Sequence, residues 1–389
     1  MDQEFNALMH NNTWQLIPAS PNMNIIGCKW VFRTKRKADG TVERYKARLV
    51  AKGFNQVAGE DFFDTFSSVV KPTTVRILFS LAVSGKWVLR QLDVHNAFLN
   101  GRLSETVYMK QTPGYEDPSH PGHVCHLQRS LYGLKQAPRV WFNRLHEFLT
   151  STGFLASKID VSLFYYTAGN SRVYLLVYVD DIIMMGNDSA LIDTLLSQLS
   201  TAFKIRDLGV PHFFLGIETV SSGDGLILSQ RRYMKDILTR SGMTDCKALA
   251  TPAVVTQPAT PSLTSFENPT QYRRIVGALQ YLTITRPDLS YSGVTPMDDH
   301  WALLKLVLRY IKGTQDYGLR LSVSSSSDLH AYTDSDWAGC PVDRKSTSGY
   351  AVFLGENLVS WVSRKQRTVS RSSIEAEYKG LADVAAEVT

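Results

Sequence analysis

Apolar residues recur along the chain with the spacings of both helices and buried strands. After Pro72, which can start a helix, the apolar positions of residues 73–83 follow helical spacing, whereas residues 88–94 form a short apolar run typical of a strand. The same reasoning predicts helices over 137–154, 191–203 and about 299–312, two strands meeting within 172–186, and a strand pair over 212–218 and 226–230. Helices and strands alternate irregularly, as in α+β proteins.

A cluster of positive charge lies near the N-terminus. Residues 29–53 contain nine Lys or Arg against two acids, and the pair Asp39-Gly40 is a strong signal for a two-residue hairpin turn. We therefore predict a β-hairpin with cations on both strands. Because charge runs usually only solvate a surface, a solvated hairpin face is the alternative to a functional one.

Two segments have the composition of linkers. Residues 251–270 contain four prolines among Thr, Ser and Ala, and residues 322–328 read SVSSSSD. At roughly 150 residues per domain, a chain of 389 residues predicts two or three packed units.

Composition narrows the class of protein. A chain with 44% hydrophobic and 20% charged residues is not mainly disordered, and its net charge of +6 favours a polyanionic partner. The four cysteines lie too far apart for a zinc knuckle or a readable disulfide framework, which favours a reducing compartment. The longest apolar run, residues 173–185, is interrupted by Asp180 and Asp181, so we expect a soluble, intracellular protein with no membrane partner.

Carboxylates stand at the ends of two apolar strands. Asp180 and Asp181 lie where the two strands of residues 172–186 turn, and Asp93 ends the strand of residues 88–94. Desolvated carboxylates are costly unless a cation compensates them, and a sheet that joins such strand ends can hold two Mg²⁺ ions about 4 Å apart for phosphoryl transfer. Taken singly, each acid is also explained as an ordinary turn or cap residue.

The motifs around these acids resemble one family. The string YVDD at 178–181, preceded by QLDVHNAFLNG at 91–101 and SLYGLKQAPRVWFNRL at 130–145, resembles the reverse transcriptase of copia-type long-terminal-repeat retrotransposons. Further blocks similar to that family lie, in the family's order, at residues 26–54, 213–218, 272–291, 332–339 and 370–378. The resemblance therefore covers essentially the whole chain.

The resemblance implies an α+β fold with a right-hand polymerase of fingers, palm and thumb. The expected divisions are a reverse transcriptase over residues 1–250, a linker and connection over 251–328, and a truncated ribonuclease H-like α/β domain over 329–389. The segment SGVTPMDD, residues 292–299, is shorter than the helical segment usual there, which suggests a deletion.

The resemblance also implies roles for single residues. Asp93, Asp180 and Asp181 would be catalytic and would hold Mg²⁺, for which Mn²⁺ can substitute. The other implied contacts are Lys46 and Arg48 with the triphosphate, Phe98 with the sugar C2′, Gly133 and Gln136 with the nucleotide, and Phe214, Leu215 and Gly216 with the primer as its grip. For Phe98 and Phe214, a plain core position is the alternative.

In the C-terminal region, Asp334 and Glu377 match metal-binding acids of a ribonuclease H. Asp336, Glu375 and Asp383 are close enough to confuse the assignment, although Glu375 and Glu377 cannot share a helix face. Because the family continues into further metal-binding carboxylates, we expect no ribonuclease H activity from this chain. We also expect unpaired edges on strands near 329–334 and 350–354 and an uncovered apolar face.

These features together predict an RNA-directed DNA polymerase acting on an RNA or DNA template with a primer and on dNTPs. We expect it in the cytoplasm, within a virus-like particle in an intact element, or in the nucleus. The rival hypothesis is a catalytically dead remnant that still binds nucleic acid. Intact acids favour the polymerase and truncation favours the remnant, while the sequence leaves the oligomeric state unknown.

Overall fold

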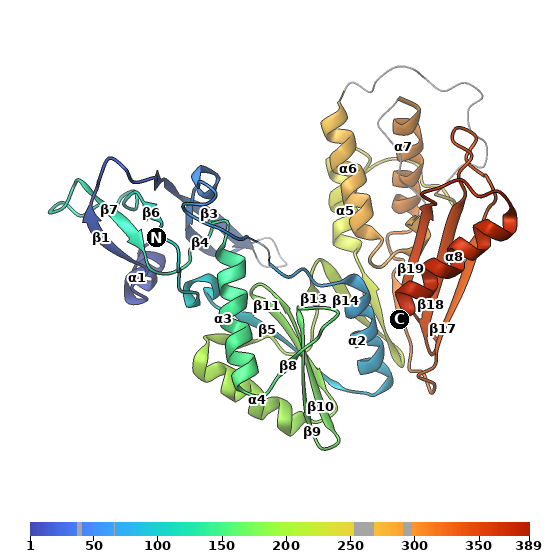
Figure 1. The fold of residues 1–389 in the computed structure, drawn as a ribbon, viewed down its shortest axis with the longest axis horizontal. Helices are drawn as coiled ribbons and strands as arrows, with labels where there is room; N and C mark the ends of the chain where they lie inside the picture. Colours follow the sequence, from blue (N-terminus) through green and yellow to red (C-terminus); the bar gives the residue numbers. More distant parts are fainter. Residues whose placement is uncertain (37–40, 66, 253–267, 291–297) are drawn as a thin grey trace. The chain divides into compact units, whose positions relative to one another are not determined.

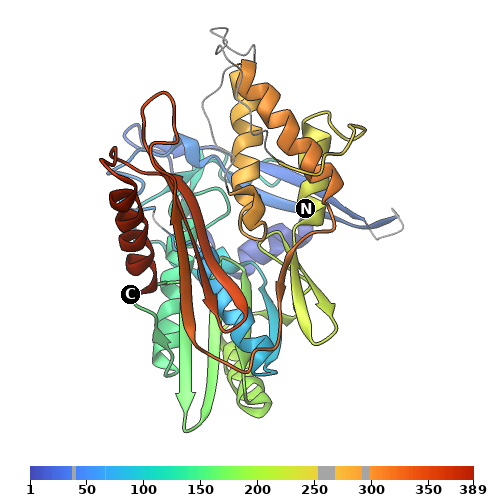
Figure 2. The ribbon, with the colours of Figure 1, turned by 90° about the vertical axis from the view of Figure 1, so that its right-hand side faces the viewer.

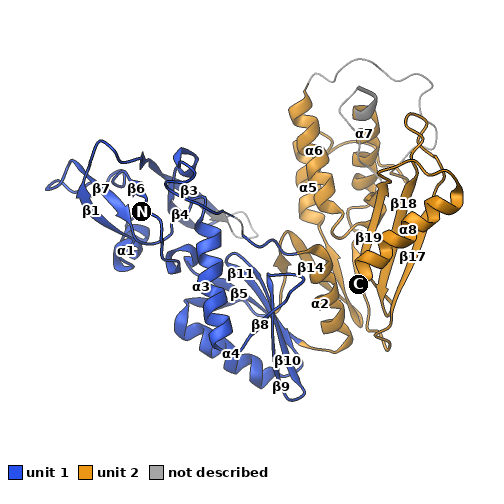
Figure 3. Ribbon diagram, in the orientation of Figure 1, with its two compact units in different colours: residues 1–70, 88–209 blue, residues 71–87, 210–389 orange. Residues whose placement is uncertain are grey.

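A computed structural model describes residues 1–36, 41–65, 67–252, 268–290 and 298–389 of a mixed α/β chain (Figure 1). The residues cluster into two compact units (Figure 3): residues 1–70 with 88–209 form unit 1, and residues 71–87 with 210–389 form unit 2. The predicted Asp39-Gly40 turn, most of the predicted linker and most of the shortened segment lie outside the described residues. None of the helices in the described ranges is long and apolar enough to cross a membrane.

Unit 1 is built around an antiparallel sheet of six strands. Its elements are α1 (Asp2–His10), β1 (Trp14–Pro18), β2 (Ile25–Ile26), β3 (Cys28–Arg36), β4 (Val42–Ala51), η1 (Gly53–Asn55), β5 (Val88–Val94), η2 (Ala97–Asn100), β6 (Tyr108–Met109), β7 (His123–Leu127), α3 (Ala137–Ser151), β8 (Leu155–Ala156), β9 (Leu163–Ala168), β10 (Ser171–Tyr178), β11 (Asp181–Gly186), α4 (Ser189–Ala202) and β12 (Ile205–Asp207). The six-stranded order is β12-β5-β11-β10-β9-β8, and a second sheet has the order β1-β7-β6-β2.

Strands β5 and β11 lie inside the six-stranded sheet and contribute to the apolar core of unit 1. Ile182, Ile183, Met184 and Met185 of β11 are fully buried, and Ile182 and Met184 belong to the apolar core of unit 1. The apolar faces of α3 and α4 join the same core through side chains such as Trp141. The predicted strand over 88–94 and the helices over 137–154 and 191–203 are confirmed by β5, α3 and α4.

The predicted basic hairpin is formed by β3 and β4. Val31 lies opposite Arg48 and Arg33 opposite Lys46, so these side chains share one face of the two-stranded ribbon. Cations therefore do lie on both strands.

Unit 2 combines helices with two small sheets. Its elements are α2 (Pro72–Ser84), β13 (Phe213–Phe214), β14 (Ile217–Ser222), β15 (Gly225–Ser229), α5 (Arg231–Arg240), α6 (Pro269–Leu282), η3 (Pro287–Leu289), α7 (Asp298–Gly313), β16 (Leu319–Leu321), β17 (Leu329–Ser335), β18 (Thr347–Leu354), β19 (Asn357–Lys365) and α8 (Ser373–Val388). Helices α5, α6 and α7 share a buried apolar cluster, and β13 to β16 form one sheet in chain order.

The C-terminal strands form a sheet of three, in the order β17-β18-β19, with α8 along one face (Figure 2). The sheet has an open edge at β17, as expected. The expectation for residues 350–354 was wrong, because they belong to the central strand β18 and are paired on both sides. The apolar surface is also partly covered: α8 packs on β17 and β18, and α2 packs on β19.

One predicted strand is interrupted. Residues 212–218 contain two short strands, because Leu215 and Gly216 form a two-residue turn in which φ is +49° and +69°. Positive φ at both central positions is the pattern of a type I′ hairpin, whose twist matches its flanking strands. The apolar run concealed this turn because leucine is not a usual turn residue.

We expect Gly133→Ala to lower the thermal midpoint of unfolding far more than Gly114→Ala. Both glycines have positive φ, +93° and +81°, so both substitutions incur backbone strain of about 1–2 kcal/mol. A Cβ at residue 133 would also lie 2.1 Å from the Ala51 carbonyl oxygen, whereas a Cβ at residue 114 meets nothing within 4 Å. Equal midpoints for the two variants, measured by circular dichroism, would contradict this close approach.

Candidate functional site

The three predicted acids of unit 1 come together at one end of the six-stranded sheet. Asp93 is the penultimate residue of β5 and lies opposite Asp181, the first residue of β11. Directly opposite residues of antiparallel strands project from the same face, so these carboxylates are neighbours. Asp180 lies in the turn before Asp181, where its carbonyl accepts a 2.9 Å hydrogen bond from the Val94 amide. Strand pairing therefore assembles the site.

The local electrostatics disfavour ionisation of two of these carboxyl groups. Burial, reinforced by the charges of Asp180 and Asp93, raises the pKa of Asp181 to about 6. Burial also raises the pKa of Asp180, and Asp93 adds to that effect, while the cations Arg48 and Lys46 oppose it. The cluster thus holds more negative charge than its surroundings compensate.

A divalent cation suits such a donor set. Carboxylate oxygens are the ligands that Mg²⁺ prefers, and a bound cation would compensate the burial and the repulsion that raise the pKa values of Asp180 and Asp181. Within the described ranges, no three His, Cys, Asp or Glu side chains converge in the geometry of a formed metal site. The fit therefore rests on the chemistry and pairing of Asp93, Asp180 and Asp181.

The two predicted cations of β4 lie within electrostatic range of these acids. Both Lys46 and Arg48 lower the pKa of Asp180, which means that each favours its ionised form. The guanidinium of Arg48 lies 4.4 Å from the centre of the Tyr132 ring, and its buried Nε has no hydrogen-bond partner among the residues that the structure describes.

Tyr132 lies beside the candidate site, although the sequence analysis did not single it out. Its ring contacts both Arg48 and Phe98, with the Phe98 and Tyr132 ring centres 4.7 Å apart in an edge-on arrangement. Burial raises the pKa of the Tyr132 hydroxyl to about 12, and the charges of Asp180 and Asp93 contribute. Its place in the block SLYGLKQAPR was the available signal.

The predicted nucleotide contacts differ in how accessible they are. Phe98 is 9% exposed, so little of its side chain can contact a ligand. Gln136 is fully buried: its amide nitrogen donates 2.9 Å to the Asp61 carbonyl, and its amide oxygen accepts from Gln56 at 3.0 Å. Gly133 is needed for the close approach of its backbone to Ala51. Gln136 and Gly133 are thus occupied in holding the loop against the end of β4.

The predicted primer grip lies in unit 2. Phe214 is 1% exposed, so its side chain is a core group, the alternative stated for it above. The adjoining turn at Leu215 and Gly216 is held by Tyr281, whose hydroxyl donates to the Leu215 carbonyl. Within residues 214–216, the backbone of the turn is therefore more accessible to a ligand than the Phe214 ring.

The C-terminal acids can be sorted by their partners. Glu375 caps α8: its carboxylate accepts from the Arg371 amide and pairs with Lys379 at 2.9 Å. Asp336 accepts from two backbone amides, and Asp383 pairs with Arg364 at 2.8 Å. In the described part of the chain, the carboxylates of Asp334 and Glu377 make no such bond, and they lie on elements that pack together, β17 and α8.

Comparison with known proteins gives a family and several relatives. Residues 11–255 match the reverse transcriptase (RNA-dependent DNA polymerase) family. The chain is 48% and 47% identical, over 397 residues, to the retrovirus-related Pol polyproteins from transposons RE2 and RE1 of Arabidopsis thaliana. It is 37% identical over 396 residues to the Pol polyprotein from transposon TNT 1-94 of Nicotiana tabacum.

The chain is much shorter than these relatives. The two Arabidopsis comparisons cover 100% of this chain but 27% of each polyprotein, and the tobacco comparison covers 97% and 30%.

We expect Asp181→Asn to raise the thermal midpoint of the metal-free protein at pH 7.5. The pKa of Asp181 is about 6 in the fold against an ordinary value of 3.8, so the folded state binds this proton more tightly than the unfolded chain. Ionisation therefore costs stability as the pH rises from near 4 to above 6. The gain from asparagine should be largest at pH 7.5 and smaller at pH 5.

The exposed Glu147 of α3 provides a control for this experiment. Glu147→Gln should change the midpoint little, because substitutions of exposed residues usually stay within about 0.5 kcal/mol. A gain for Asp181→Asn that is the same at pH 5 and pH 7.5 would argue against the raised pKa.

Proposed function

Because the chain belongs to the reverse transcriptase family and its relatives are copia-type Pol polyproteins, we propose that it is the RNA-directed DNA polymerase module of such an element. In the proposed reaction, the primer 3′-oxygen attacks the α-phosphorus of a dNTP, a new phosphodiester bond forms, and pyrophosphate leaves. The observation that carries this proposal is the strand register that sets Asp93 opposite Asp181, with Asp180 in the adjoining turn.

In this proposal, the six-stranded sheet of unit 1 is the palm and the β3–β4 hairpin belongs to the fingers. The three-helix cluster of α5, α6 and α7 takes the place of the thumb. This would extend the polymerase beyond residue 250, into the segment predicted as a connection. Residues 329–389 would be the ribonuclease H-like part.

Asp93, Asp180 and Asp181 would hold Mg²⁺, the cation that reverse transcriptases generally use. When bound, such ions stabilise the attacking and leaving oxygens of phosphoryl transfer. The protein's own contribution is the rigid placement of the three carboxylates by β5 and β11. The raised pKa values of Asp180 and Asp181 are consistent with a site that a bound cation completes.

Lys46 and Arg48 would bind the triphosphate of the incoming nucleotide. Their side chains share one face of the hairpin, and their charges reach the acid cluster. Arg48 is held over the Tyr132 ring, so part of its conformational freedom is lost before a ligand arrives. These features support a functional hairpin face over a merely solvated one.

Phe98, supported by Tyr132, would contact the sugar and exclude a 2′-hydroxyl. The template and primer would be held mainly through phosphate contacts, without reading of sequence. Gly133 and Gln136 would act on the nucleotide through the loop that they shape, and the turn at Leu215 and Gly216 would contact the primer. Asp334 and Glu377 would be the metal-binding acids of the ribonuclease H-like part, because their rivals are engaged elsewhere.

Primer extension on poly(rA)/oligo(dT) tests the proposed function directly. A polymerase adds nucleotides in the presence of Mg²⁺ or Mn²⁺, whereas a nucleic-acid-binding remnant retains the duplex and adds none. Retention is measured on the same sample by a filter-binding or fluorescence-anisotropy assay.

We expect Asp93→Asn and Asp180→Asn each to abolish nucleotide addition while template-primer binding is largely retained. Loss of a carboxylate removes a metal ligand, whereas Lys and Arg contacts with phosphate supply most of the affinity. Asp193→Asn, which removes an exposed carboxylate of α4, should keep full activity. Extension by either site variant at the wild-type rate would eliminate the metal assignment.

We expect Phe98→Val to incorporate ribonucleotides far better than the wild type. Removing the ring opens space for a 2′-hydroxyl, and discrimination of this kind is steric. The control is Phe154→Val, a buried aromatic that packs on Tyr166 and should lose stability but not selectivity. An unaltered dNTP/rNTP preference in Phe98→Val would make Phe98 an ordinary core residue.

A further inference from the structure

The turn that carries Asp180 has an unusual backbone. Tyr178 pairs with Asp181, so Val179 and Asp180 are the two loop residues of the β10–β11 hairpin. Val179 has φ of +53°, whereas Asp180 is not in the left-handed region. Positive φ at the first loop residue alone is the pattern of a type II′ turn, which favours glycine there. A β-branched valine in this conformation is strained.

Two hydrogen bonds hold this turn from outside the hairpin. The indole Nε1 of Trp141 donates to the Val179 carbonyl at 2.7 Å, and the Val94 amide donates to the Asp180 carbonyl at 2.9 Å. The Val179 carbonyl belongs to the peptide group that joins Val179 to Asp180. Rotation of that peptide group would re-aim the Asp180 side chain, and the Trp141 hydrogen bond opposes such rotation.

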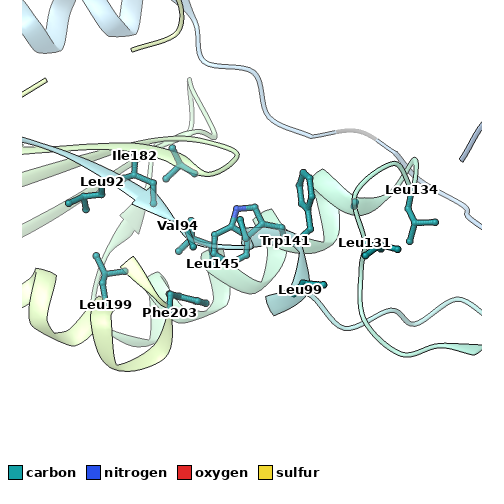
Figure 4. Close-up of a cluster of buried hydrophobic side chains, with 14 of the residues drawn as sticks. Leu92, Val94, Leu99, Leu131, Leu134, Trp141, Leu145, Ile182, Leu199 and Phe203 are labelled. Carbon is teal, nitrogen blue, oxygen red and sulfur yellow. The ribbon is translucent and has the colours of Figure 1, made fainter. Parts of the chain in front are cut away.

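Trp141 is itself rigidly placed. It is fully buried on α3, and its ring meets that of Phe203 edge-on, with centres 5.2 Å apart. Figure 4 shows the indole packed among Val94, Leu145 and Phe203, between α3 and the sheet. Because a buried indole N–H without a partner is costly, this donor and the Val179 carbonyl depend on each other.

We propose that Trp141 is a positioning residue: its indole N–H holds the strained Val179–Asp180 peptide in the orientation that presents Asp180 beside Asp93. The role rests on the proposed function, since it assumes that Asp180 serves as a metal ligand. The strained backbone of Val179 favours rotation of this peptide group, and the hydrogen bond from Trp141 opposes that rotation.

The test compares Trp141→Phe with Phe203→Leu. Phenylalanine keeps an aromatic ring on α3 but removes the donor, whereas Phe203→Leu disturbs the same packing and leaves the hydrogen bond in place. We expect Trp141→Phe to lower kcat for primer extension about 10- to 100-fold, the cost of a catalytic group misplaced by about 1 Å, with KM for dNTP within about twofold. Phe203→Leu should destabilise the protein and leave kcat within about twofold, since it touches no reacting group.

Val179→Gly completes the experiment as a double-mutant cycle. Glycine adopts positive φ without strain, so the turn should need the restraint less, and Trp141→Phe/Val179→Gly should recover most of the lost kcat. Additive effects, or a loss in Trp141→Phe no larger than in Phe203→Leu, would overturn the positioning role.

A second readout separates this proposal from the proposed function. Binding of Mn²⁺ alone is measured from the electron paramagnetic resonance signal of the free ion. The resulting affinity depends on how the carboxylates are placed and requires no catalysis. We expect Trp141→Phe to weaken Mn²⁺ binding and Phe203→Leu to leave it unchanged. If the wild type adds no nucleotide, the proposed function fails, and this comparison still decides the role of Trp141: equal Mn²⁺ affinity in both variants would refute it.

Discussion

The pairing of β5 with β11 is the constraint on which the candidate site depends. It places Asp93 opposite Asp181 and leaves Asp180 in the adjoining turn, so three like charges share a half-buried corner. Side chains alternate between the faces of a strand, and a slip of one residue would exchange Asp181 with the fully buried Ile182. Because the side chains from Ile182 to Met185 are buried whereas Asp181 is not, burial favours this register, and the register places the carboxylates. Strand pairing therefore holds the three carboxylates together although their negative charges repel one another.

The surroundings of this corner join the basic hairpin to the acids. The Ala51 amide, at the end of β4, donates to the Tyr132 carbonyl at 2.7 Å, and Gly133 allows the two backbones to approach closely. Gln136 secures the following turn of chain through buried hydrogen bonds to Gln56 and the Asp61 carbonyl. Arg48 is thereby brought over Tyr132, within reach of Asp180. Gly133 and Gln136, which the resemblance assigns to nucleotide binding, thus also position the strand that carries Arg48.

Sequence patterns predicted those helices and strands that can be recognised from their own residues, without knowledge of their tertiary contacts. The apolar run of β5 and the helical spacing of α3 reflect burial in one core, and both were predicted closely. The hydrophobic pattern over residues 212–218 predicted one strand, although the resemblance implied a primer grip at Phe214 to Gly216; glycine favours the positive φ of Gly216, but the apolar Leu215 gives no turn signal. Trp141 was used only as a helix-face residue, since its hydrogen bond to a carbonyl 38 positions later is a tertiary contact that spacing does not encode. The three acids were singled out because carboxylates at the ends of apolar strands are costly without a cation, and the strand register brings them together, while their catalytic role stays a prediction that the resemblance implies.

The boundary between the two compact units does not coincide with the end of the region that matches the reverse transcriptase family. Residues 11–255 match the reverse transcriptase family, yet α2, which lies inside that range, packs on β19 beyond it. Arg76 of α2 is 5% exposed and lies 3.8 Å from the centre of the Trp361 ring, and burial lowers its pKa to about 10. A guanidinium so enclosed depends on its partners, because a buried cation stripped of them is strongly destabilising. The strands after residue 328 also cover apolar surface of α2, because Ile77 packs against the cluster of Val352, Val359 and Val384, so a fragment cut at the family boundary would expose that surface.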